Sequence, residues 1–496
     1  MAAPHTPGFF GTHRYAAVQR IMGILMMLFS LTMLPPIFVD MLYENSVGSS
    51  FLLGLWITLG TGAVVWWPVR RARKELRTRD GFLITVLFWT VLSAFGAIPL
   101  YVAHQAWHSY TDALFEAVSG LTTTGATMVS HGLDQLPHAL NFYRAQLHWF
   151  GGMGIIVLAV AVLPMLGIGG MQLYRAETPG PMKDSKLTPR ITSTARALWV
   201  VYVLLTVACG ITYWLLGMSP FDAICHAMST LATGGFSTHD ASIAWFNSLP
   251  IEIAAMVFMM LGASNFALHY TVWRYRDLRA YLRDTEFRAY LGIIAVMGVL
   301  ICAPLYLSGV YPDLGTAIRK GMFQLVAYGT DAGFSTADPS DWPGYVPLLL
   351  VLATFMVSCA GGTGGGVKVV RLVLFTKQAM REMQKLVHPS AEVAIKFDGK
   401  IVSNNVVYAV GGFFSMYIGS TVLLSFLMMM TGLDPVTAFS AVAACINNAG
   451  PGLHAVNSNM ANVTEFGKCV LIFAMLLGRL EIFTLLILFT PAFWRR

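Results

Sequence analysis

The sequence predicts an all-α polytopic membrane protein with about ten transmembrane helices. The 496 residues are 56% hydrophobic and 11% charged, whereas soluble proteins average about 45–50% apolar and about 25% charged residues. Length alone would suggest about three soluble domains, but so few charged side chains cannot cover three separate surfaces. Long apolar windows also alternate with short connections in which basic residues cluster, as in chains that cross a membrane repeatedly.

Ten apolar windows are long enough to cross a bilayer as helices. The first follows Arg14 and Arg20, exceeds a secretory signal in length and has no obvious cleavage site, so we expect it to be retained. The windows near 345–375 and 466–493 are long enough to be broken or tilted. The windows lie near residues 21–42, 51–69, 82–103, 145–168, 197–217, 249–273, 289–309, 345–375, 402–430 and 466–493.

Lys and Arg are distributed unevenly between the connections. The basic connections, with five or six such residues each, are 70–79, 175–196, 274–288 and 377–400. The connections with none are 43–50, 104–141, 218–247 and 431–462. The connection 310–344 holds only Arg319 and Lys320. The positive-inside rule places the basic set in the cytoplasm, and an even number of spans leaves both termini there as well.

The charge and the cysteines indicate no further class of protein. The net charge of +7 comes from separate short clusters between apolar spans, so we do not expect nucleic acid binding. The six cysteines are scattered, mostly within apolar stretches, and form no C-x-x-C pair. We interpret them as packing residues.

Four outer connections share one design. Each begins with an Asp suited to capping a short helix, continues through an apolar helix-length stretch and reaches a Gly flanked by Thr, Ala or Asn. The Asp and Gly residues are Asp112 and Gly125, Asp222 and Gly235 (thirteen apart in both), Asp313 and Gly333 (twenty apart), and Asp434 and Gly450 (sixteen apart). We therefore expect four repeats of span, short helix, loop and span around one pore.

These repeats follow an extra pair of N-terminal helices, and the last helix of the third repeat is expected to be broken. The expected units are 1–80 for the extra pair, then 81–172, 190–274, 287–378 and 400–496 for the four pore repeats.

The four glycine-centred loops are candidate cation sites. They are almost uncharged, and irregular backbone at this depth must line a water-filled cavity within the protein. Glycine accepts a positive φ, so consecutive carbonyls can turn toward one axis and replace the hydration shell of a potassium ion. The C-terminal ends of the short helices would add partial negative charge. The candidate residues are Thr123, Thr124, Gly125, Thr233, Gly234, Gly235, Asp331, Ala332, Gly333, Asn448, Ala449 and Gly450.

A second feature, here named the glycine loop, is the run Gly361, Gly362, Thr363, Gly364, Gly365 and Gly366 inside an apolar window. Five glycines in six positions cannot stay helical, because each costs about 1 kcal/mol relative to Ala. A phosphate-binding loop is not expected, since Val367 stands between Gly366 and Lys368 where the motif requires Gly-Lys. We expect a mobile intramembrane loop that acts as a gate, with glycines as hinges.

Arg479 lies near the middle of the last apolar run, where a charged side chain costs at least about 2.5–3.5 kcal/mol. It should face the pore or a backbone carbonyl, as a positive barrier or as an anchor for the glycine loop. Glu481 projects from a different helix face, so direct pairing with Arg479 is not expected. Lys368 and Arg371 have two open roles, repelling cations in the pore or extending toward the cytoplasm.

Three titratable residues lie close to the loops, namely Glu116, His226 and Asp331. A proton relay through them is one interpretation. The alternative is that each bonds to neighbouring backbone, which is the more common role of a lone polar side chain on a pore helix.

The chain resembles the TrkH-type potassium-uptake subunits of bacteria, within the wider superfamily that includes KtrB and fungal Trk transporters. The resemblance covers nearly the whole chain. It rests on 119–127 (SGLTTTGAT), 149–154 (WFGGMG), 170–181 (GMQLYRAETPGP), 234–242 (GGFSTHDAS), the glycine loop and 477–481 (LGRLE).

The resemblance implies that Gly125, Gly235, Gly333 and Gly450 are filter glycines of one potassium pathway. It also implies that the glycine loop gates this pathway from below, with Arg479 beside it. The family works as a homodimer on a ring of cytosolic TrkA-type subunits that bind nucleotides. Any ATP, ADP or NAD would therefore belong to that partner, and this chain would hold no cofactor.

The sequence departs from the family pattern at two positions. Asp331 stands where the family usually has an uncharged residue, and we expect an ionised Asp331 to concentrate cations at the outer mouth. Gly362 stands where the glycine loop usually has Ser, and we expect the extra glycine to make the gate more mobile.

Together these features predict potassium uptake across a bacterial inner membrane, driven by the membrane potential. One alternative is a symporter that couples potassium to sodium or protons, which differs in energetics and not in architecture. Another is a subunit that only anchors its partners and conducts nothing. An intramembrane enzyme is not expected, because H-E-x-x-H and G-x-S-x-G are absent and the twelve histidines have no metal-ligand spacing.

Overall fold

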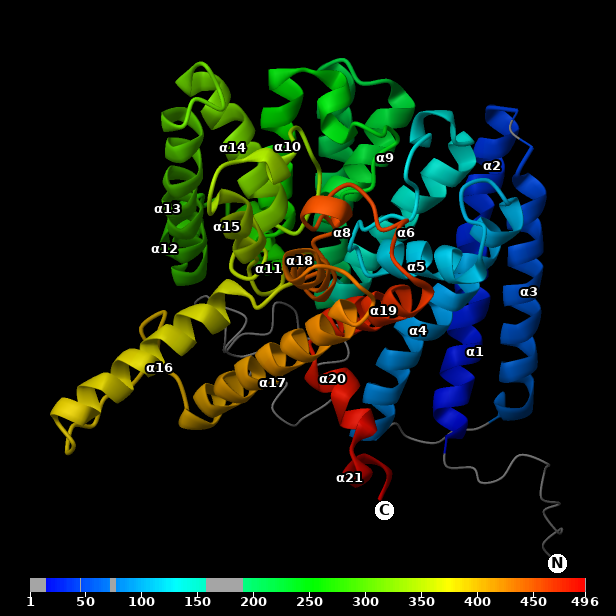
Figure 1. The fold of residues 1–496 in the computed structure, drawn as a ribbon. Helices are drawn as coiled ribbons and strands as arrows, with labels where there is room; N and C mark the ends of the chain where they lie inside the picture. Colours follow the sequence, from blue (N-terminus) through cyan, green and yellow to red (C-terminus); the bar gives the residue numbers. More distant parts are fainter. Residues whose placement is uncertain (1–14, 45, 72–76, 158–190, 496) are drawn as a thin grey trace, which may run out of the picture.

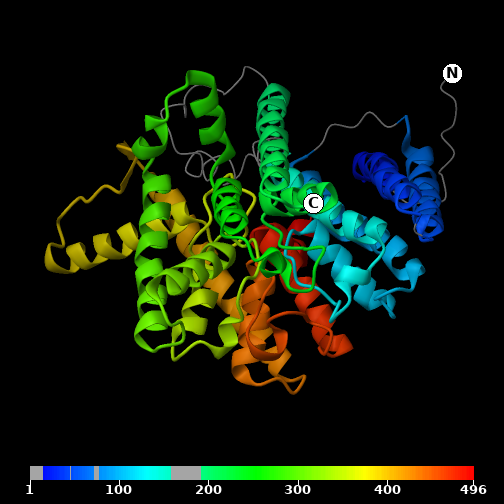
Figure 2. The same cartoon turned by 90° about the horizontal axis from the view of Figure 1, so that it is seen from above.

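The computed structural model describes residues 15–44, 46–71, 77–157 and 191–495. Within these ranges the chain is helical apart from loops and one short hairpin, as the sequence predicts. Figure 1 shows the helices side by side in a broad bundle, with α16 and α17 leaving it obliquely. Seen from above, the repeats follow one another around the centre, and the N-terminal helices stand at one edge (Figure 2).

The N-terminal pair consists of α1 (Ala16–Ser30), continued by α2 (Leu34–Leu42), and α3 (Gly48–Trp66). Two glycines let α1 and α3 cross closely. A Cβ on Gly23 would lie 2.8 Å from the carbonyl oxygen of Gly62, and one on Gly62 would lie 3.0 Å from that of Gly23. Small residues at such a crossing allow helix backbones to approach in a membrane, where lipid supplies no hydrophobic drive for association.

The same order of elements then occurs four times. The first repeat has α4 (Thr78–Ala103), α5 (Tyr110–Leu121) and α6 (His138–Val157), and the second has α8 (Ile191–Leu215), α9 (Pro220–Leu231), α10 (Leu249–Gly262) and α11 (Phe266–Tyr275). The third has α13 (Thr285–Leu307), α14 (Leu314–Gly329), α15 (Val346–Ala353) and α16 (Val369–Val387), and the fourth has α17 (Asn404–Met429), α18 (Pro435–Ile446), α19 (Glu465–Arg479) and α20 (Phe483–Leu486).

Short elements complete the chain. They are α12 (Arg279–Arg283), α21 (Pro491–Trp494), the hairpin of β1 (Lys396–Phe397) and β2 (Lys400–Ile401), and 3-10 turns at Leu31–Met33, Trp67–Val69, Leu133–Gln135, Ser242–Phe246, Pro339–Asp341, His454–Val456 and Ile487–Phe489. Among them, α12 joins the second repeat to the third, and the hairpin joins the third to the fourth.

The short helices of the repeats, here named the pore helices, are α5, α9, α14 and α18. Asp313 and Asp434 cap α14 and α18 as expected, because their carboxylates accept the backbone N–H groups of Thr316 and Thr437. In the first two repeats the predicted Asp caps are wrong. Ser109 and Ser219 are the caps there, and Asp112 and Asp222 stand three residues later, at the third helical position.

This correction makes the repeats more regular than the Asp spacing indicated. Counted from the true cap, the loop glycine follows after sixteen residues in the first, second and fourth repeats and after twenty in the third. The difference is one helical turn, because α14 has 16 residues and the other pore helices have 12 each.

The ten predicted spans are not all continuous helices. In the described part of the chain, six helices are long and apolar enough to cross a membrane without a break: Ala16–Leu42, Gly48–Val69, Arg79–Ala103, Arg196–Leu215, Thr285–Leu307 and Asn404–Met429. The window at 145–168 begins within α6, and its predicted end lies outside the described residues. The remaining three windows, which follow the pore loops of the second, third and fourth repeats, are interrupted.

The interruption of the window at 249–273 was not predicted. There α10 and α11 meet at 99° across residues 263–265, and the side chain of Asn265 caps α11 by accepting the N–H of Ala267. In the fourth repeat, α19 and the following segment 483–489 meet at 110° just after Arg479. In the third, the glycine loop separates α15 from α16, as expected.

The two basic residues of the 310–344 connection have a buried partner. Glu252 on α10 accepts both Nε (2.6 Å) and a terminal nitrogen (2.9 Å) of Arg319, and Lys320 lies 3.5 Å away. The Glu252 side chain is 1% exposed. These cations therefore tie the third repeat to the second, which explains their presence in a connection that otherwise lacks basic residues.

Candidate functional site

The four glycine-centred loops meet one another in a closed ring. At each loop glycine the missing side chain faces a backbone oxygen of the next repeat. A Cβ on Gly125 would lie 1.9 Å from the oxygen of Gly234, one on Gly235 2.2 Å from that of Ala332, one on Gly333 2.6 Å from that of Ala449, and one on Gly450 2.6 Å from that of Thr124. The order first, second, third, fourth and first again closes the circle, so the loops surround one centre.

The residue two positions before each loop glycine turns the chain out of its pore helix. These residues are Thr123, Thr233, Asp331 and Asn448, with φ of 54°, 51°, 59° and 57°. A left-handed non-glycine residue is uncommon, and Asp and Asn adopt it more readily than Thr. The next N–H then bonds to a carbonyl near the end of the pore helix, as from Thr124 to Ser119 at 2.8 Å. Each pore helix thus ends at the ring, with its negative dipole end toward the centre.

Glycines behind the ring were not singled out individually by sequence reasoning. A Cβ on Gly151 would lie 2.0 Å from the oxygen of Leu121, and one on Gly478 would lie 1.9 Å from that of Ile446. Gly262 has the same relation to Leu231, at 2.9 Å. Each follows its loop glycine by 26 to 28 residues, a spacing that could have revealed them. In the first, second and fourth repeats, these glycines let the helix after the loop pack closely against the end of the pore helix.

The glycine loop is docked to the break between α10 and α11. The N–H of Cys359 donates to the oxygen of Ala263 at 2.9 Å, and the N–H of Thr363 donates to that of Gly262 at 3.0 Å. In the reverse direction, the N–H of Phe266 donates to the oxygen of Gly361 at 3.2 Å. The break that the sequence did not predict therefore exposes the backbone groups that the glycine loop uses.

The glycine loop also packs against the ends of the pore helices. A Cβ on Gly365 would lie 1.8 Å from the oxygen of Asn447, and one on Gly364 would lie 2.9 Å from that of Thr330. The hydroxyl of Thr363 donates toward the backbone oxygen of Leu231 at 2.9 Å and lies 3.2 Å from the hydroxyl of Thr233. The glycines are therefore required for close approach as well as for hinge freedom.

The structure gives Gly362 a packing role in addition to the predicted mobility. A Cβ at this position would lie 2.4 Å from the oxygen of Ala263 and 2.9 Å from that of Ser264. A serine would have to push the glycine loop away from the α10–α11 break. Whether Gly362 makes the gate more mobile stays a prediction.

Arg479 anchors the glycine loop. One terminal nitrogen of its guanidinium donates to the oxygen of Thr363 at 3.0 Å, and the other donates to that of Gly151 at 3.1 Å. The side chain is buried and faces backbone carbonyls, one of the two environments that its cost in a membrane predicted. This one side chain therefore joins the fourth repeat both to the glycine loop and to the first repeat.

Lys368 and Arg371 are both buried and both paired. The ammonium of Lys368 donates to the oxygen of Gly364 and lies 3.3 Å from the hydroxyl of Ser358. Arg371 donates to Glu481 at 2.6 Å, and its guanidinium lies over the ring of Phe413. Lys368 therefore stabilises the glycine loop itself, while Arg371 ties α16 to the bend after α19. The prediction that Glu481 does not pair with Arg479 agrees with these contacts.

Asp331 does not lie at the outer mouth, so that prediction is wrong. Its side chain is fully buried, and its Oδ2 lies 3.6 Å from the position that a Cβ on Gly366 would take. The backbone N–H of Gly365 in the glycine loop faces its carboxylate. The left-handed turn at the end of α14 directs this side chain toward the glycine loop, a depth that its position in the sequence could not reveal.

Glu116 and His226 are saturated with partners. Glu116 accepts Nε of Arg144 at 2.8 Å and the N–H of Met128 at 2.8 Å. His226 lies 2.9 Å from the oxygen of Asp222 through Nδ1 and 2.9 Å from the hydroxyl of Ser237 through Nε2. A carbonyl only accepts, so Nδ1 carries the proton and the ring is satisfied as the neutral form. These contacts fit the structural interpretation of both residues better than a proton relay.

The ion pair of Glu116 and Arg144 fastens two loops to each other. Arg144 on α6 also donates to the oxygen of Ser237 at 3.2 Å and lies over the ring of Phe236. Sequence reasoning missed Arg144. The signal was available, because Arg144 is a lone basic residue next to outer connections without Lys or Arg, and Glu116 is a lone acidic residue in the apolar part of the first pore helix.

A histidine cluster joins the outer segments of the first two repeats. Nδ1 of His239 lies 2.5 Å from Asp134, its Nε2 lies 3.4 Å from Asp222, and its ring stacks on Trp245 at 4.4 Å. Asp240 accepts the N–H of Gly132 at 2.8 Å. Partial burial opposes the charged ring, but the bonds to Asp222 and Asp134 outweigh it and raise the pKa of His239 above its ordinary value.

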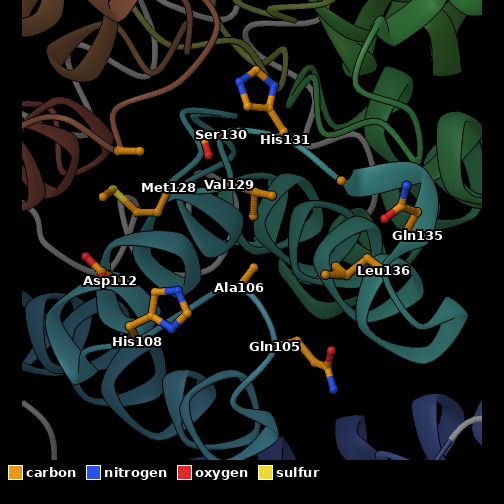
Figure 3. Close-up of a pocket in the computed structure, with 12 residues that line it drawn as sticks. Gln105, Ala106, His108, Asp112, Met128, Val129, Ser130, His131, Gln135 and Leu136 are labelled. Carbon is orange, nitrogen blue, oxygen red and sulfur yellow. The ribbon is translucent and has the colours of Figure 1, made fainter.

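A cavity of about 490 Å³ opens beside the first loop, as Figure 3 shows. Residues from both sides of the first pore loop line it, among them His108, Asp112 and His131, and Ala461 of the fourth repeat closes it. Asp112 is also paired with Lys468 at 2.6 Å. Across the described residues, no group of three or more His, Cys, Asp or Glu side chains could hold a metal ion.

Removal of Arg144 should destabilise the protein strongly. Arg144→Met leaves the buried carboxylate of Glu116 without its counter-ion, and breaking such a pair costs about 3–5 kcal/mol. We expect this loss in the free energy of unfolding of the protein in detergent. The double variant Glu116→Gln with Arg144→Met should recover part of it, because no charge is then left unpaired. A change below about 1 kcal/mol in Arg144→Met would contradict this role of the pair.

The His239 cluster should make stability depend on pH. Because the folded state raises the pKa of His239, the protonated ring contributes fully below the unfolded value of about 6.5, and the contribution is lost as pH rises through the higher folded value. We expect the melting temperature to fall as the pH rises above about 6.5 and through the higher pKa of the folded state. His239→Gln should flatten this fall, and His131→Gln, at an exposed histidine nearby, should not. Equal slopes in all three proteins would rule the cluster out as the cause.

The chain is similar to known proteins over nearly its whole length. A sequence model for the family described as "TrkH: Cation transport protein" matches residues 47–496. The chain is 52% identical over 483 residues to the Trk system potassium uptake protein TrkH of Halomonas elongata, covering 97% of this chain and 99% of that protein. It is 42% identical over 484 residues to TrkG of Escherichia coli, covering 98% and 99%.

A solved structure is also similar. The crystal structure of the potassium transporter TrkH from Vibrio parahaemolyticus superposes with a TM-score of 0.90 at 47% identity. The match covers 97% of this chain and 100% of that one. The overall fold is therefore that of a solved protein of similar length.

Proposed function

Because the chain belongs to the TrkH family of cation transport proteins, whose members are transporters and not enzymes, we propose that it takes up potassium ions across the inner membrane of a bacterium. Relatives that match nearly the whole chain are named as potassium uptake proteins. The membrane potential supplies the driving force, worth about 2.3 kcal/mol per charge for each 100 mV. The distribution of Lys and Arg supports our proposal that both termini lie in the cytoplasm.

The observation that carries the proposal is the closed contact of the four loops. Each loop glycine lies against a backbone oxygen of the next repeat, and the oxygens involved belong to Thr124, Gly234, Ala332 and Ala449. We place the filter at this ring, where carbonyl oxygens take the place of the water around a potassium ion. Four pore-helix ends add partial negative charge at the same point.

We further propose that the glycine loop is the gate of this pathway. It contacts the pore-helix ends of the second, third and fourth repeats through Leu231, Thr330 and Asn447. Its anchors are hydrogen bonds to backbone and to Arg479, which can be exchanged for water when the loop moves. Asp331, buried beside the glycine loop, offers carboxyl oxygens to an ion that has passed the ring.

Assembly is part of the same proposal. We propose a homodimer that rests on a cytosolic TrkA-type subunit, with any regulating nucleotide bound by that subunit and no cofactor bound by this chain. The amphipathic helix α16 is evidence for a partner on the cytosolic side. It leaves Met380, Met383 and Leu386 exposed and carries the basic residues Lys377 and Lys385.

The repeat boundaries complete the proposal. We assign residues 81–172, 190–274, 287–378 and 400–496 to the four pore repeats and residues 1–80 to the extra helix pair. The recurrence of span, pore helix, loop and second span supports this division.

The filter assignment can be tested with two alanine substitutions of the same kind. Gly125 and Gly132 both have a left-handed backbone, with φ of 81° and 91°, so Ala at either costs about 1–2 kcal/mol. Only at Gly125 does the new Cβ meet an oxygen, at 1.9 Å, since nothing lies within 4 Å of a Cβ on Gly132. We expect Gly125→Ala to reduce potassium-dependent rubidium uptake into liposomes at least tenfold and Gly132→Ala to retain most of it.

Both proteins should first be shown to be folded by the same thermal-unfolding assay. Wild-type uptake in Gly125→Ala would contradict the placement of the filter. A wild-type protein that moves no ions, with or without its cytosolic partner, would contradict potassium uptake itself and favour an anchoring subunit.

A further inference from the structure

Glu286 connects the two ends of the glycine loop. It lies in the first turn of α13, the first span of the third repeat, and its side chain is fully buried. One carboxylate oxygen, Oε1, accepts the N–H of Ala360 at 2.7 Å and the N–H of Val370 at 3.1 Å. These donors stand immediately before the glycine loop and in the first turn of α16, ten residues apart. One atom therefore fixes the distance between the two ends.

Helix α16 depends on this contact because it has no cap of its own. Its N-cap residue, Lys368, has a φ of 69° and makes no side-chain capping bond. The first two N–H groups of the helix are satisfied from outside it, that of Val369 by the oxygen of Ser358 at 2.8 Å and that of Val370 by Glu286. A carboxylate at this end of a helix is also favoured by the helix dipole.

The glycine loop thus has two separate sets of anchors. Arg479 and the α10–α11 break hold its middle, through the oxygen of Thr363 and the backbone of Gly262. The break also bonds the first end of the loop, at Cys359 and Gly361. Glu286 holds its base, where it bonds both ends at once through Ala360 and Val370. We propose that Glu286 is a positioning residue for the gate, keeping the base of the glycine loop closed so that only the middle has to move. This rests on the proposed function of the glycine loop as the gate of an ion pathway.

The chemistry of the contact provides matched variants. The second oxygen of Glu286 has no hydrogen-bond partner among the described residues. Glu286→Gln can therefore keep its oxygen on both N–H groups and place its NH₂ where the free oxygen was. Glu286→Asp keeps the carboxyl group, but its side chain is one methylene shorter and cannot reach both donors. Glu286→Leu removes both bonds at similar volume.

The chain carries its own reporter for the state of the loop base. Cys359 stands next to Ala360 and is 1% exposed, whereas Cys445 is fully buried within α18, the pore helix of the fourth repeat. Cys469 is exposed and would react first, so it is replaced by Ser in every protein tested. A small water-soluble methanethiosulfonate reagent then labels whatever buried cysteine opens, and peptide mass spectrometry locates the label.

We expect Glu286→Leu to label Cys359 at least ten times faster than the parent protein, because bonds to a carboxylate worth at least about 1.4 kcal/mol are lost. Glu286→Gln should stay within about twofold, and Glu286→Asp should fall between them. Cys445 should remain unlabelled in all of them. Potassium flux through the Glu286→Leu protein in liposomes should rise in parallel with the labelling of Cys359.

Two results would overturn the proposal. One is a parent-like labelling rate of Cys359 in a Glu286→Leu protein whose Cys445 is protected. The other is a Glu286→Gln protein that labels as fast as Glu286→Leu. If Glu286→Leu also exposes Cys445, Glu286→Asp decides, since faster labelling of Cys359 alone supports the role and no change refutes it. Labelling does not depend on flux, so a parent protein that moves no ions would refute the gate and leave this test of Glu286 readable.

Discussion

Four backbones approach so closely at the ring that no side chain fits between them. At Gly125 and Gly235 a Cβ would stand 1.9 and 2.2 Å from an oxygen of the next repeat, well inside van der Waals contact. Only glycine readily combines this approach with its own left-handed backbone, whose φ is 81° at Gly125 and 83° at Gly235. In the filter that we propose, this close approach gathers carbonyl oxygens around one point without any charged ligand, a form of site that favours a weakly held monovalent cation.

The rest of the structure holds this contact in place. Glycines such as Gly151 and Gly478 press the following helices onto the ends of the pore helices. The buried pair of Glu116 and Arg144 holds the first two loops together, and Arg479 holds the glycine loop against the ends of the pore helices. Buried charges are costly in a membrane, and each of these spans two repeats. Their common effect is to keep four separately formed loops at fixed distances from one another.

The sequence predicted what depends on local pattern and missed what depends on contact across repeats. The recurring Asp-to-Gly order revealed the pore helices, and five glycines near Thr363 revealed the break of the third repeat. Ser109 was missed as a cap because Asp112 also fits a helix start. The break at Asn265 carries no glycine or proline run, and the depth of Asp331 follows from a turn that spacing does not encode. The bonds of Glu286 join residues 74 and 84 positions apart, and no local pattern marks such pairs.

Crystals grown or soaked with thallium or rubidium in place of potassium would test the filter most directly, because both ions scatter anomalously and have the size of potassium. The account predicts an anomalous peak at the centre of the ring, within coordination distance of the backbone oxygens of Thr124, Gly234, Ala332 and Ala449. A pathway that bound these ions elsewhere, with no peak inside the ring, would contradict it.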